Sequence, residues 1–406
     1  MSNTIENVLI LQGGGSLGAF GCGVFKALAN NNIKIDIIAG TSMGGLNSSI
    51  VAGSREDHPE KALEQFWLEL AEGNSTNLNF PDYPTSTVDS STLTRISQAK
   101  STMSFYGSAL HGNKKVFAPR WRPEHFFTDS HYFIPEKWTY LYDHSPLVKT
   151  AEKYIDYNKL QPNGNPNARL IITAVNVLTA EPLFFDSAKQ QITSKHILAT
   201  TGYPTYYFPW VEVEKGIYAW DGSLLSNTPL REVIDASPVK DKRIYLVENY
   251  PKNIDKLPDN LQEVQHRTRD IMFSDKTLHN IQMSKTITYY LRLIDDLYKM
   301  LEDHFGSEKK EDKAKFEKIR ARYKKVSEEH GAEIKGLHYI TRTEHIPSLY
   351  ENADFSLPTI KNSIKDGEIK TNQILKDIEM SLYASIRHHF ILVEKISRIK
   401  NETKVL

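Results

Sequence analysis

The sequence predicts an α/β protein with a mainly parallel central sheet that is covered by helices on both faces. Two stretches near the N-terminus carry this prediction. Residues 7–12 and residues 33–40 are short apolar runs, and each ends in a glycine-flanked turn that leads into a helical pattern. Apolar strands that alternate with helices are typical of parallel sheets, which bind ligands at the carboxyl ends of their strands.

Further strands are expected after a long interruption. From about residue 74 to residue 167 the pattern changes to Ser/Thr, Pro and aromatic clusters, which indicates an insertion. Strand character then returns at residues 168–178, 183–185, 211–220 and 242–248. We therefore expect the sheet to end near residue 250.

The chain is long enough for more than one folding unit. Domains rarely exceed about 250–300 residues, and this chain has 406. Beyond Asp259 almost all of the sequence has helical composition. We predict a catalytic domain over residues 1–255, including the insertion, and a helical C-terminal region over residues 256–406.

The composition restricts the class of protein and its partners. Apolar residues make up 40% and charged residues 25% of the chain, which is typical of a folded protein and excludes a collagen-like or wholly disordered one. Fifty basic residues balance fifty acidic ones, so no global field draws the chain to nucleic acid. The single cysteine, Cys22, excludes an intramolecular disulfide and a zinc site built from cysteines. We expect no metal, no cofactor and no nucleic-acid partner.

The localisation expected from the sequence is cytoplasmic. The N-terminal apolar run is too short for a signal peptide, and no run approaches the length needed to span a bilayer. Contact with a membrane would then be peripheral and would depend on a local surface. The sequence carries no signal for the oligomeric state.

A glycine-rich turn follows the first apolar run. Gly13, Gly15 and Gly18 satisfy the G-x-G-x-x-G pattern of dinucleotide-binding units, which also need an acid at the carboxyl end of the second strand. Asp36 falls at the other end of that strand. Backbone N–H groups around Gly14 suit an oxyanion as well as a phosphate, because they lie at the N-terminus of a helix. A tight turn without a ligand is the alternative.

The second apolar run ends in a candidate nucleophile. Gly40-Thr41-Ser42-Met43-Gly44 matches G-x-S-x-G on a strand-to-helix turn, where a strained serine exposes its hydroxyl and small flanking residues leave room. The alternative is a helix N-cap serine.

A serine nucleophile needs a base to accept its proton, and Asp221 is a candidate because it ends a strand and precedes Gly222. Asp221 as a simple turn residue is the alternative. The chain order Ser42, Asp221, His266 also matches an α/β-hydrolase triad. Because His266 lies in a charged helical pattern, we expect it to be solvated.

These elements together resemble the patatin-like phospholipase family, including its bacterial members. Residues 13–18 look like its glycine-rich oxyanion motif, residues 40–44 like its nucleophile elbow, and Asp221-Gly222 like its base motif. The resemblance covers roughly residues 7–250. It implies a patatin-like three-layer α/β/α fold and a lipid or phospholipid substrate. It departs from the family at Leu17, where a basic residue is frequent, and at Ser223, where Gly or Ala is usual.

The resemblance also implies roles for individual residues. Ser42 and Asp221 would form a Ser-Asp dyad without histidine, in a serine acyl hydrolase of phospholipase A or lysophospholipase type. The oxyanion hole would come from Gly13, Gly14 and Gly15. Supporting positions in the motifs would be Gly18, Gly40, Gly44 and Gly222. The alternatives are the triad esterase and a nucleotide- or anion-binding module that uses the glycine turn.

Two aromatic segments are candidates for contact with lipid. Residues 114–127 contain four bases and four aromatic residues, which suits the headgroup level of a membrane, although a packed loop explains them too. The bases are Lys114, Lys115, Arg120 and Arg122. Residues 203–210 contain three tyrosines, Phe208 and Trp210, which would line an acyl pocket or pack in the core.

Overall fold

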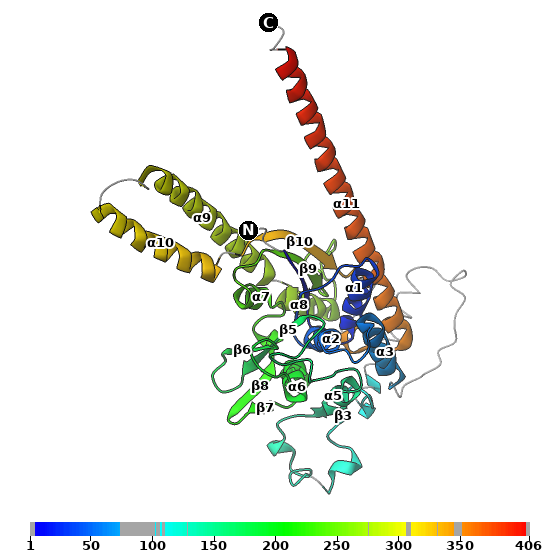
Figure 1. Ribbon diagram of the computed structural model, residues 1–406. Coiled ribbons are helices and arrows are strands. Elements are labelled where there is room, and N and C mark those ends of the chain that lie inside the picture. The colour runs from blue at the N-terminus through cyan, green and yellow to red at the C-terminus, as the bar shows by residue number, and fades with distance from the viewer. Residues whose placement is uncertain are drawn as a thin grey trace, which may run out of the picture.

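The computed structural model describes residues 5–73, 102, 106–107, 110–127, 129–274, 276–305, 310–330, 332–344 and 351–402. Figure 1 shows an α/β body from which α9, α10 and α11 extend. The part of the predicted insertion between residues 74 and 101 lies outside the described residues.

A mixed, mostly parallel sheet forms the centre of the body. Its strands are β1 (Glu6–Leu11), β2 (Ile37–Gly40), β5 (Arg169–Asn176), β6 (Pro182–Asp186), β7 (Val211–Glu214), β8 (Ile217–Asp221), β9 (Lys242–Glu248) and β10 (Ile334–Thr341). They pair in the order β10-β9-β1-β2-β5-β8-β7, and β6 also pairs with β5. The pairs from β10 to β5 are parallel, whereas β6, β7 and β8 form antiparallel pairs. The predicted fold class is confirmed.

Helices pack around this sheet (Figure 1). They are α1 (Gly18–Asn30), α2 (Met43–Ala52), α3 (Pro59–Glu72), α5 (Ser145–Ala151), α6 (Ser194–Thr201), α7 (Leu230–Ala236), α8 (Leu261–Ser274), α9 (Lys276–Phe305), α10 (Lys310–His330) and α11 (Leu357–Glu402). Short 3-10 turns near the site are η1 (Gly15–Leu17), η4 (Pro204–Tyr206), η5 (Gly222–Leu224) and η6 (Glu351–Ala353).

Two hydrophobic cores cover the two faces of the sheet. Successive side chains of a strand point to opposite faces, and β1 divides in this way. Leu9 and Leu11 belong to the core that contains α1, α2 and α3. Val8 and Ile10 belong to the second core, which includes residues of α7 and α9. A slip of one residue would exchange the two sets, so the burial on both sides specifies the register that presents the glycine turn.

The sheet does not end near residue 250, as the sequence suggested. β10 pairs in parallel with β9, with Leu337 opposite Ile244. Most of its side chains are only partly buried, so this strand lacks the strong apolar pattern of a central one, and charged helical sequence precedes it. The predicted division near residue 255 stays a prediction, but residues on both sides of it share one sheet.

The first part of α11 packs closely on α1. A Cβ atom on Gly23 would lie 1.9 Å from the carbonyl oxygen of Ile364, and a Cβ on Gly367 would lie 2.2 Å from that of Phe20. The glycines therefore permit the two helices to touch backbone to backbone. Within the described ranges, none of the helices is long and apolar enough to cross a membrane.

Candidate active site

Ser42 sits on a sharp turn between β2 and α2. Its φ of 56° is positive, a backbone conformation that costs a non-glycine residue energy. The N–H of Ser42 donates to Oγ1 of Thr200 (3.1 Å), and that hydroxyl donates to the carbonyl of Thr173 (2.7 Å). Although Ser42 occupies the N-cap position of α2, its hydroxyl makes no capping hydrogen bond. The strained turn is therefore held by its surroundings, and the hydroxyl is left for another task.

The flanking glycines are required by close backbone contacts. A Cβ on Gly40 would lie 2.3 Å from the carbonyl of Gly44, and a Cβ on Gly44 would lie 2.1 Å from the carbonyl oxygen of Leu11. A side chain on Gly40 would thus collide with the start of α2, and one on Gly44 would push the turn away from β1.

Strand β5 brings Ser42 and Asp221 to the same place. Some residues of β5 pair with both β6 and β2, and others pair with both β6 and β8. Because a strand has one neighbour on each edge, β2 and β8 both lie along the edge of β5 that faces away from β6. Gly40, at the end of β2, pairs with Ile172, and Asp221, at the end of β8, pairs with Ala174. The two strands run toward each other, and the residues that end them meet there.

Asp221 is buried, and no cation pairs with it among the residues that the structure describes. Its Oδ1 accepts hydrogen bonds from the N–H (2.9 Å) and the hydroxyl (2.7 Å) of Ser223. Burial raises its pKa from 3.8 to about 6, while Ser223 and the nearby Ser42 hydroxyl act in the opposite direction. Oδ2 is buried and makes no hydrogen bond of normal geometry to any described residue. The Ser42 hydroxyl nevertheless lies close enough to the carboxyl group to lower its pKa.

The glycine turn presents two N–H groups rather than three. The N–H of Gly13 donates to Oδ1 of Asn227 (2.9 Å) and is therefore occupied. Gly14 (φ 155°) and Gly15 (φ 60°) adopt conformations that favour glycine. Among the described residues, neither of their N–H groups has an acceptor. Of the three glycines predicted to form the oxyanion hole, Gly14 and Gly15 thus have N–H groups available, whereas the N–H of Gly13 is used to anchor the turn.

Sequence reasoning missed the residues that anchor this turn. Asn249 donates from Nδ2 to the carbonyls of Gln12 and Gly13, both at 3.1 Å. Its own N–H donates to Oε1 of Gln12 (3.0 Å). These contacts join the ends of β1 and β9, which are 237 positions apart in the chain, so no local pattern marks them.

Ser42 opens into a cavity of about 570 Å³. Its walls are mainly apolar and come from the glycine turn, the insertion, η4, α8, and η6 with the segment after it. Four residues of the aromatic segment predicted to line an acyl pocket do line it, whereas Trp210 does not: these four are Tyr203, Tyr206, Tyr207 and Phe208. Asn352 and Phe355 also line it, so the C-terminal region contributes to the wall.

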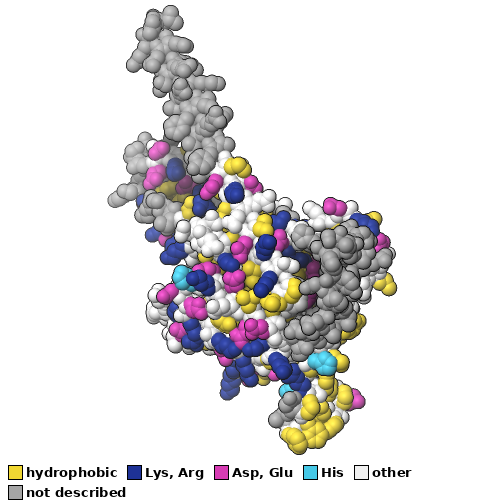
Figure 2. Space-filling model, turned by 90° about the vertical axis from the view of Figure 1, so that its right-hand side faces the viewer, with side chains coloured by type: hydrophobic (Ala, Val, Ile, Leu, Met, Phe, Trp, Pro, Cys, Tyr) yellow, Lys and Arg dark blue, Asp and Glu magenta, His cyan; other side chains and the backbone are white. Residues whose placement is uncertain are grey.

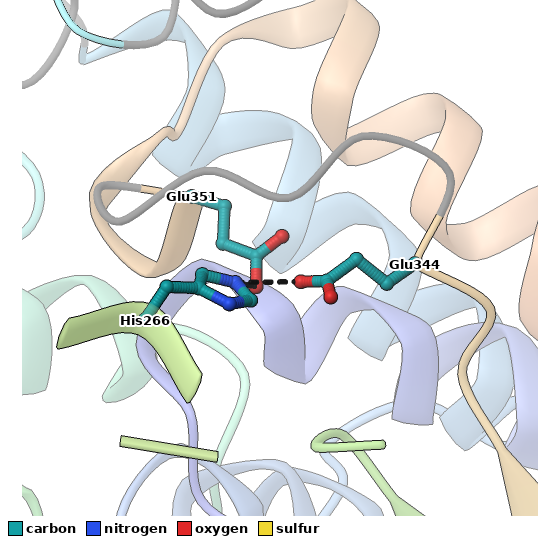
Figure 3. Close-up of side chains that lie close together, drawn as sticks. All are labelled: His266, Glu344 and Glu351. Carbon is teal, nitrogen blue, oxygen red and sulfur yellow. Dashed lines mark ion pairs between the residues drawn. The ribbon is translucent and has the colours of Figure 1, made fainter. Parts of the chain in front are cut away.

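The expectation of a solvated His266 is wrong. Its side chain is 6% exposed and forms ion pairs with Glu344 (2.7 Å), Asp270 (3.4 Å) and Glu351 (3.5 Å). Figure 3 shows the ring beside Glu344 and Glu351. These carboxylates raise its pKa to about 9 against the effect of burial, so His266 is protonated at neutral pH. α8 packs against the loops after β9 and β10, and its charges face other charges rather than water.

A different histidine, His144, lines the cavity. Its Nε2 donates to the carbonyl of Leu198 (2.8 Å), and its ring packs on Phe208 at 4.8 Å. Burial lowers its pKa to about 4, so it is neutral at pH 7. Nothing in the sequence around residue 144 distinguished it from the other histidines.

The geometry agrees with what sequence comparison finds. Residues 9–234, more than half of the chain, match the profile of the family described as patatin-like phospholipase. The chain belongs to the patatin-like phospholipase family. In this patatin-like chain the glycine turn, the serine elbow and the Asp221-Gly222 pair all lie within the matched residues.

Individual relatives are distant. A patatin-like phospholipase domain-containing protein from Coccidioides immitis (strain RS) is 40% identical over 62 residues, which are 15% of this chain and 8% of that protein. The chain therefore matches only a small part of that relative. Among solved structures, VipD from Legionella pneumophila has 14% identity and a TM-score of 0.37 over 92% of this chain and 67% of its own. ExoU from Pseudomonas aeruginosa, in complex with SpcU, has 15% identity and a TM-score of 0.25 over 65% and 47%.

Proposed function

We propose that this protein is a serine acyl hydrolase that cleaves acyl esters of lipids, of phospholipase A or lysophospholipase type, with Ser42 and Asp221 as a catalytic dyad. The observation that carries the proposal is the meeting of a strained serine with a buried carboxylate of raised pKa, at the wall of an apolar cavity. Family membership supports a lipid as the substrate.

In this mechanism Asp221 takes the proton of Ser42 as Oγ attacks the ester carbonyl. Asp221 then gives this proton to the leaving oxygen, so that the alcohol departs and an acyl-enzyme remains; water hydrolyses the acyl-enzyme with the ionised Asp221 again as base. The N–H groups of Gly14 and Gly15 bind the oxyanion. A pKa of about 6 leaves Asp221 mostly ionised at pH 7 and makes it a stronger base than an ordinary aspartate.

The two alternatives have less support. His266 is protonated and paired with three carboxylates, so it is no base for a triad. Asp36, the acid nearest to the spacing of a nucleotide site, precedes β2 and accepts the backbone N–H of Asn7 at 2.8 Å, far from the carboxyl ends of the strands.

The decisive experiment is labelling with a fluorophosphonate, followed by mapping of the adduct. Ser42 is expected to be labelled, Ser42→Ala to be inactive, and Asp221→Asn to lose both labelling and hydrolysis of a short-chain ester. His144→Gln serves as the control for a histidine base. Labelling of another serine, or loss of activity in folded His144→Gln equal to that of Asp221→Asn, would contradict the dyad.

Membrane contact belongs to the same proposal, but two of the four predicted bases are poorly placed for it. Arg120 is buried, paired with Asp129 and stacked on Tyr140 at 4.5 Å. Lys115 is paired with Glu69. Both charges are thus compensated inside the protein, and a packed loop describes this half of the segment better than a basic docking patch.

The tip of the insertion is the better candidate for contact with lipid. Phe126 packs edge to face on Phe127 (4.6 Å) and Phe133 (5.2 Å), yet Phe127 is 89% and Phe133 72% exposed. Figure 2 shows hydrophobic side chains gathered on this lobe at the lower end of the molecule. Trp121, at its base, contacts Tyr142 of the cavity wall at 5.5 Å. We propose that this aromatic tip enters the lipid interface.

Flotation with phosphatidylcholine vesicles tests the aromatic tip. The double variant Phe127→Ser, Phe133→Ser should bind at least ~10-fold more weakly, because two exposed phenyl groups contribute about 1.5–3 kcal/mol each when buried. Leu178→Ser, a change of a leucine that is 72% exposed between β5 and β6, is the matched control. This role would be contradicted if the double variant bound vesicles as well as Leu178→Ser does. It would also be contradicted if the double variant lost as much hydrolysis of a soluble ester as it lost vesicle binding.

A further inference from the structure

The turn η6 lies directly against the glycine turn. The hydroxyl of Ser16 donates to the backbone carbonyl of Glu351 at 2.6 Å. A Cβ atom on Gly15 would lie 2.1 Å from the carbonyl oxygen of Asn352. The two proposed oxyanion donors therefore rest on a segment that follows them by more than 330 residues in the chain.

Glu351 is held in place by charge. Its Oε1 accepts from Arg269 and from Arg342, both at 2.9 Å, and lies 3.5 Å from Nε2 of His266. Its side chain is 12% exposed. Charge-assisted hydrogen bonds in a buried setting are stronger and more directional than those at a surface, so the backbone of η6 is fixed where Ser16 needs it.

Arg342 links the same cluster to the other end of the glycine turn. Its Nε donates to the backbone carbonyl of Asn249 (2.9 Å), and Asn249 donates to the carbonyl of Gly13. One chain of contacts thus runs from Gly13 through Asn249, Arg342 and Glu351 to Ser16. The glycine turn is thus held on one side by Asn249, which follows β9, and on the other by Glu351 of η6, and Arg342, which follows β10, joins the two.

We infer that Glu351 and Arg342 are positioning residues, which aim the N–H groups of Gly14 and Gly15 at the reacting carbonyl and make the C-terminal region a part of the active site. The inference rests on the proposed oxyanion role of these glycines. Loss of one oxyanion donor typically lowers the rate by about 10²–10³-fold, and an imperfectly aimed donor loses part of that factor.

The cluster could be mistaken for a metal site, because ligand atoms of His266, Glu344 and Glu351 lie within 4.8 Å of one another. The surrounding charges argue against this assignment. Three cations, His266, Arg269 and Arg342, already face the carboxylates of Asp270, Glu344 and Glu351. A dication would add charge to a balanced cluster and would have to displace these bonds.

The test compares two ester substrates that differ in one atom. A thionoester develops negative charge on sulfur, which accepts hydrogen bonds more weakly than oxygen. Wild-type enzyme should therefore prefer the oxygen ester. Glu351→Gln should lower kcat for the oxygen ester at least ~10-fold with KM within about 2-fold, and should lower it less for the thionoester, so that the preference shrinks.

Two further variants make the test specific. Glu344→Gln removes a carboxylate from the same cluster, but the bonds of Glu344 to described residues go to His266 and Arg342 and not to the glycine turn. The preference of this variant for the oxygen ester should therefore stay near that of wild type. Ser16→Ala should act like Glu351→Gln, and the double variant should lose less than the sum of the two, because both changes loosen the same link between η6 and the glycine turn. If Glu351→Gln fails to fold, Ser16→Ala carries the test alone.

Each outcome has a distinct meaning. The inference is supported if Glu351→Gln and Ser16→Ala show a smaller preference for the oxygen ester over the thionoester while Glu344→Gln keeps the preference of wild type. An active wild type whose preference is unaltered by these changes, or fully additive effects, would overturn it while the dyad stands. A wild type without esterase activity would overturn the proposed function and this inference with it.

Discussion

Asp221 and Glu351 are both buried carboxylates near the cavity of Ser42, yet their surroundings move their pKa values in opposite directions. Among the described residues, hydroxyl and N–H groups but no cation surround Asp221, and burial raises its pKa to about 6. Glu351 faces two arginines and a protonated histidine, and its pKa falls to about 2. Burial alone therefore does not determine what a carboxylate can do.

The opposite pKa shifts suit the two carboxylates to different roles. A carboxylate that is costly to ionise takes up a proton readily, which suits a base that cycles during turnover. A carboxylate whose charge is compensated on several sides keeps that charge and its position, which suits a fixed structural link. The patatin-like chain uses the first beside the proposed nucleophile and the second beside the glycine turn.

The largest effect is expected for Asp221→Asn. Loss of the base should lower hydrolysis of a soluble ester by about 10²–10⁴-fold. The same change should stabilise the fold at pH 7 by up to about 3 kcal/mol, the value of a pKa rise from 3.8 to about 6. Above pH 6 the folded protein holds Asp221 ionised at an energetic cost, whereas below pH 3.8 the carboxyl group is protonated in both the folded and the unfolded protein. The gain in stability of the variant should therefore vanish in acid. Urea denaturation at both pH values measures it, and a less stable variant at pH 7 would contradict the comparison.

Loss of a charge from the cluster around Glu351 should lower the stability of the fold, whereas loss of the Asp221 charge should raise it. His266→Gln leaves carboxylates without a cation, which should cost about 3 kcal/mol of stability. The pKa of His266 is raised from 6.5 to about 9, so its contribution is complete below pH 6.5 and is lost as the pH rises through 9. Thermal unfolding of wild type and variant should therefore converge in alkali. A constant difference across this range would argue against a protonated His266.

The acid limb of the rate profile is expected to follow Asp221. In wild type, kcat/KM for a soluble ester should fall as the pH drops through about 6, because protonation removes the base. His266→Gln should leave this limb in place. A limb near the ordinary pKa of an aspartate, or one that moves with His266, would assign the proton transfer to another group.

The smallest effect is expected for Ser223→Ala. Ser223 donates its hydroxyl to Asp221, and loss of this bond should raise the pKa of Asp221 further, so the acid limb should move upward while the rate at alkaline pH stays within a few-fold of wild type. Ser226→Ala is the matched control, because its hydroxyl donates to the carbonyl of Thr228 instead. Equal profiles for wild type and Ser223→Ala would show that this bond is unimportant.

The sequence predicted the parts of the site that are built from neighbouring residues. Apolar runs, glycines and the strand-turn-helix pattern placed Ser42 on its elbow and the glycine turn before α1. Ser223, noted there only as a departure from the family's motif, bonds the proposed base. These are local features, so local patterns reveal them.

The sequence could not predict contacts between distant parts of the chain. His266 was expected in solvent because a mixed-sign charge run looks the same whether water or opposite charges face it. β10 was missed because its partly exposed pattern is weak. The bond from Ser16 to Glu351 joins residues 335 positions apart, and no local spacing encodes such a pair.

The late position of β10 has a consequence for the synthesis of the protein. The ribosome completes Ser42 and Asp221 well before it makes β10 and η6, and domains form as their chain emerges. Until residue 355 has left the exit tunnel, the glycine turn lacks its clamp and the cavity lacks the wall formed by Asn352 and Phe355. An unfinished chain would thus carry the proposed dyad without its finished surroundings, and lipids near the ribosome would meet the complete site only after translation of β10 and η6.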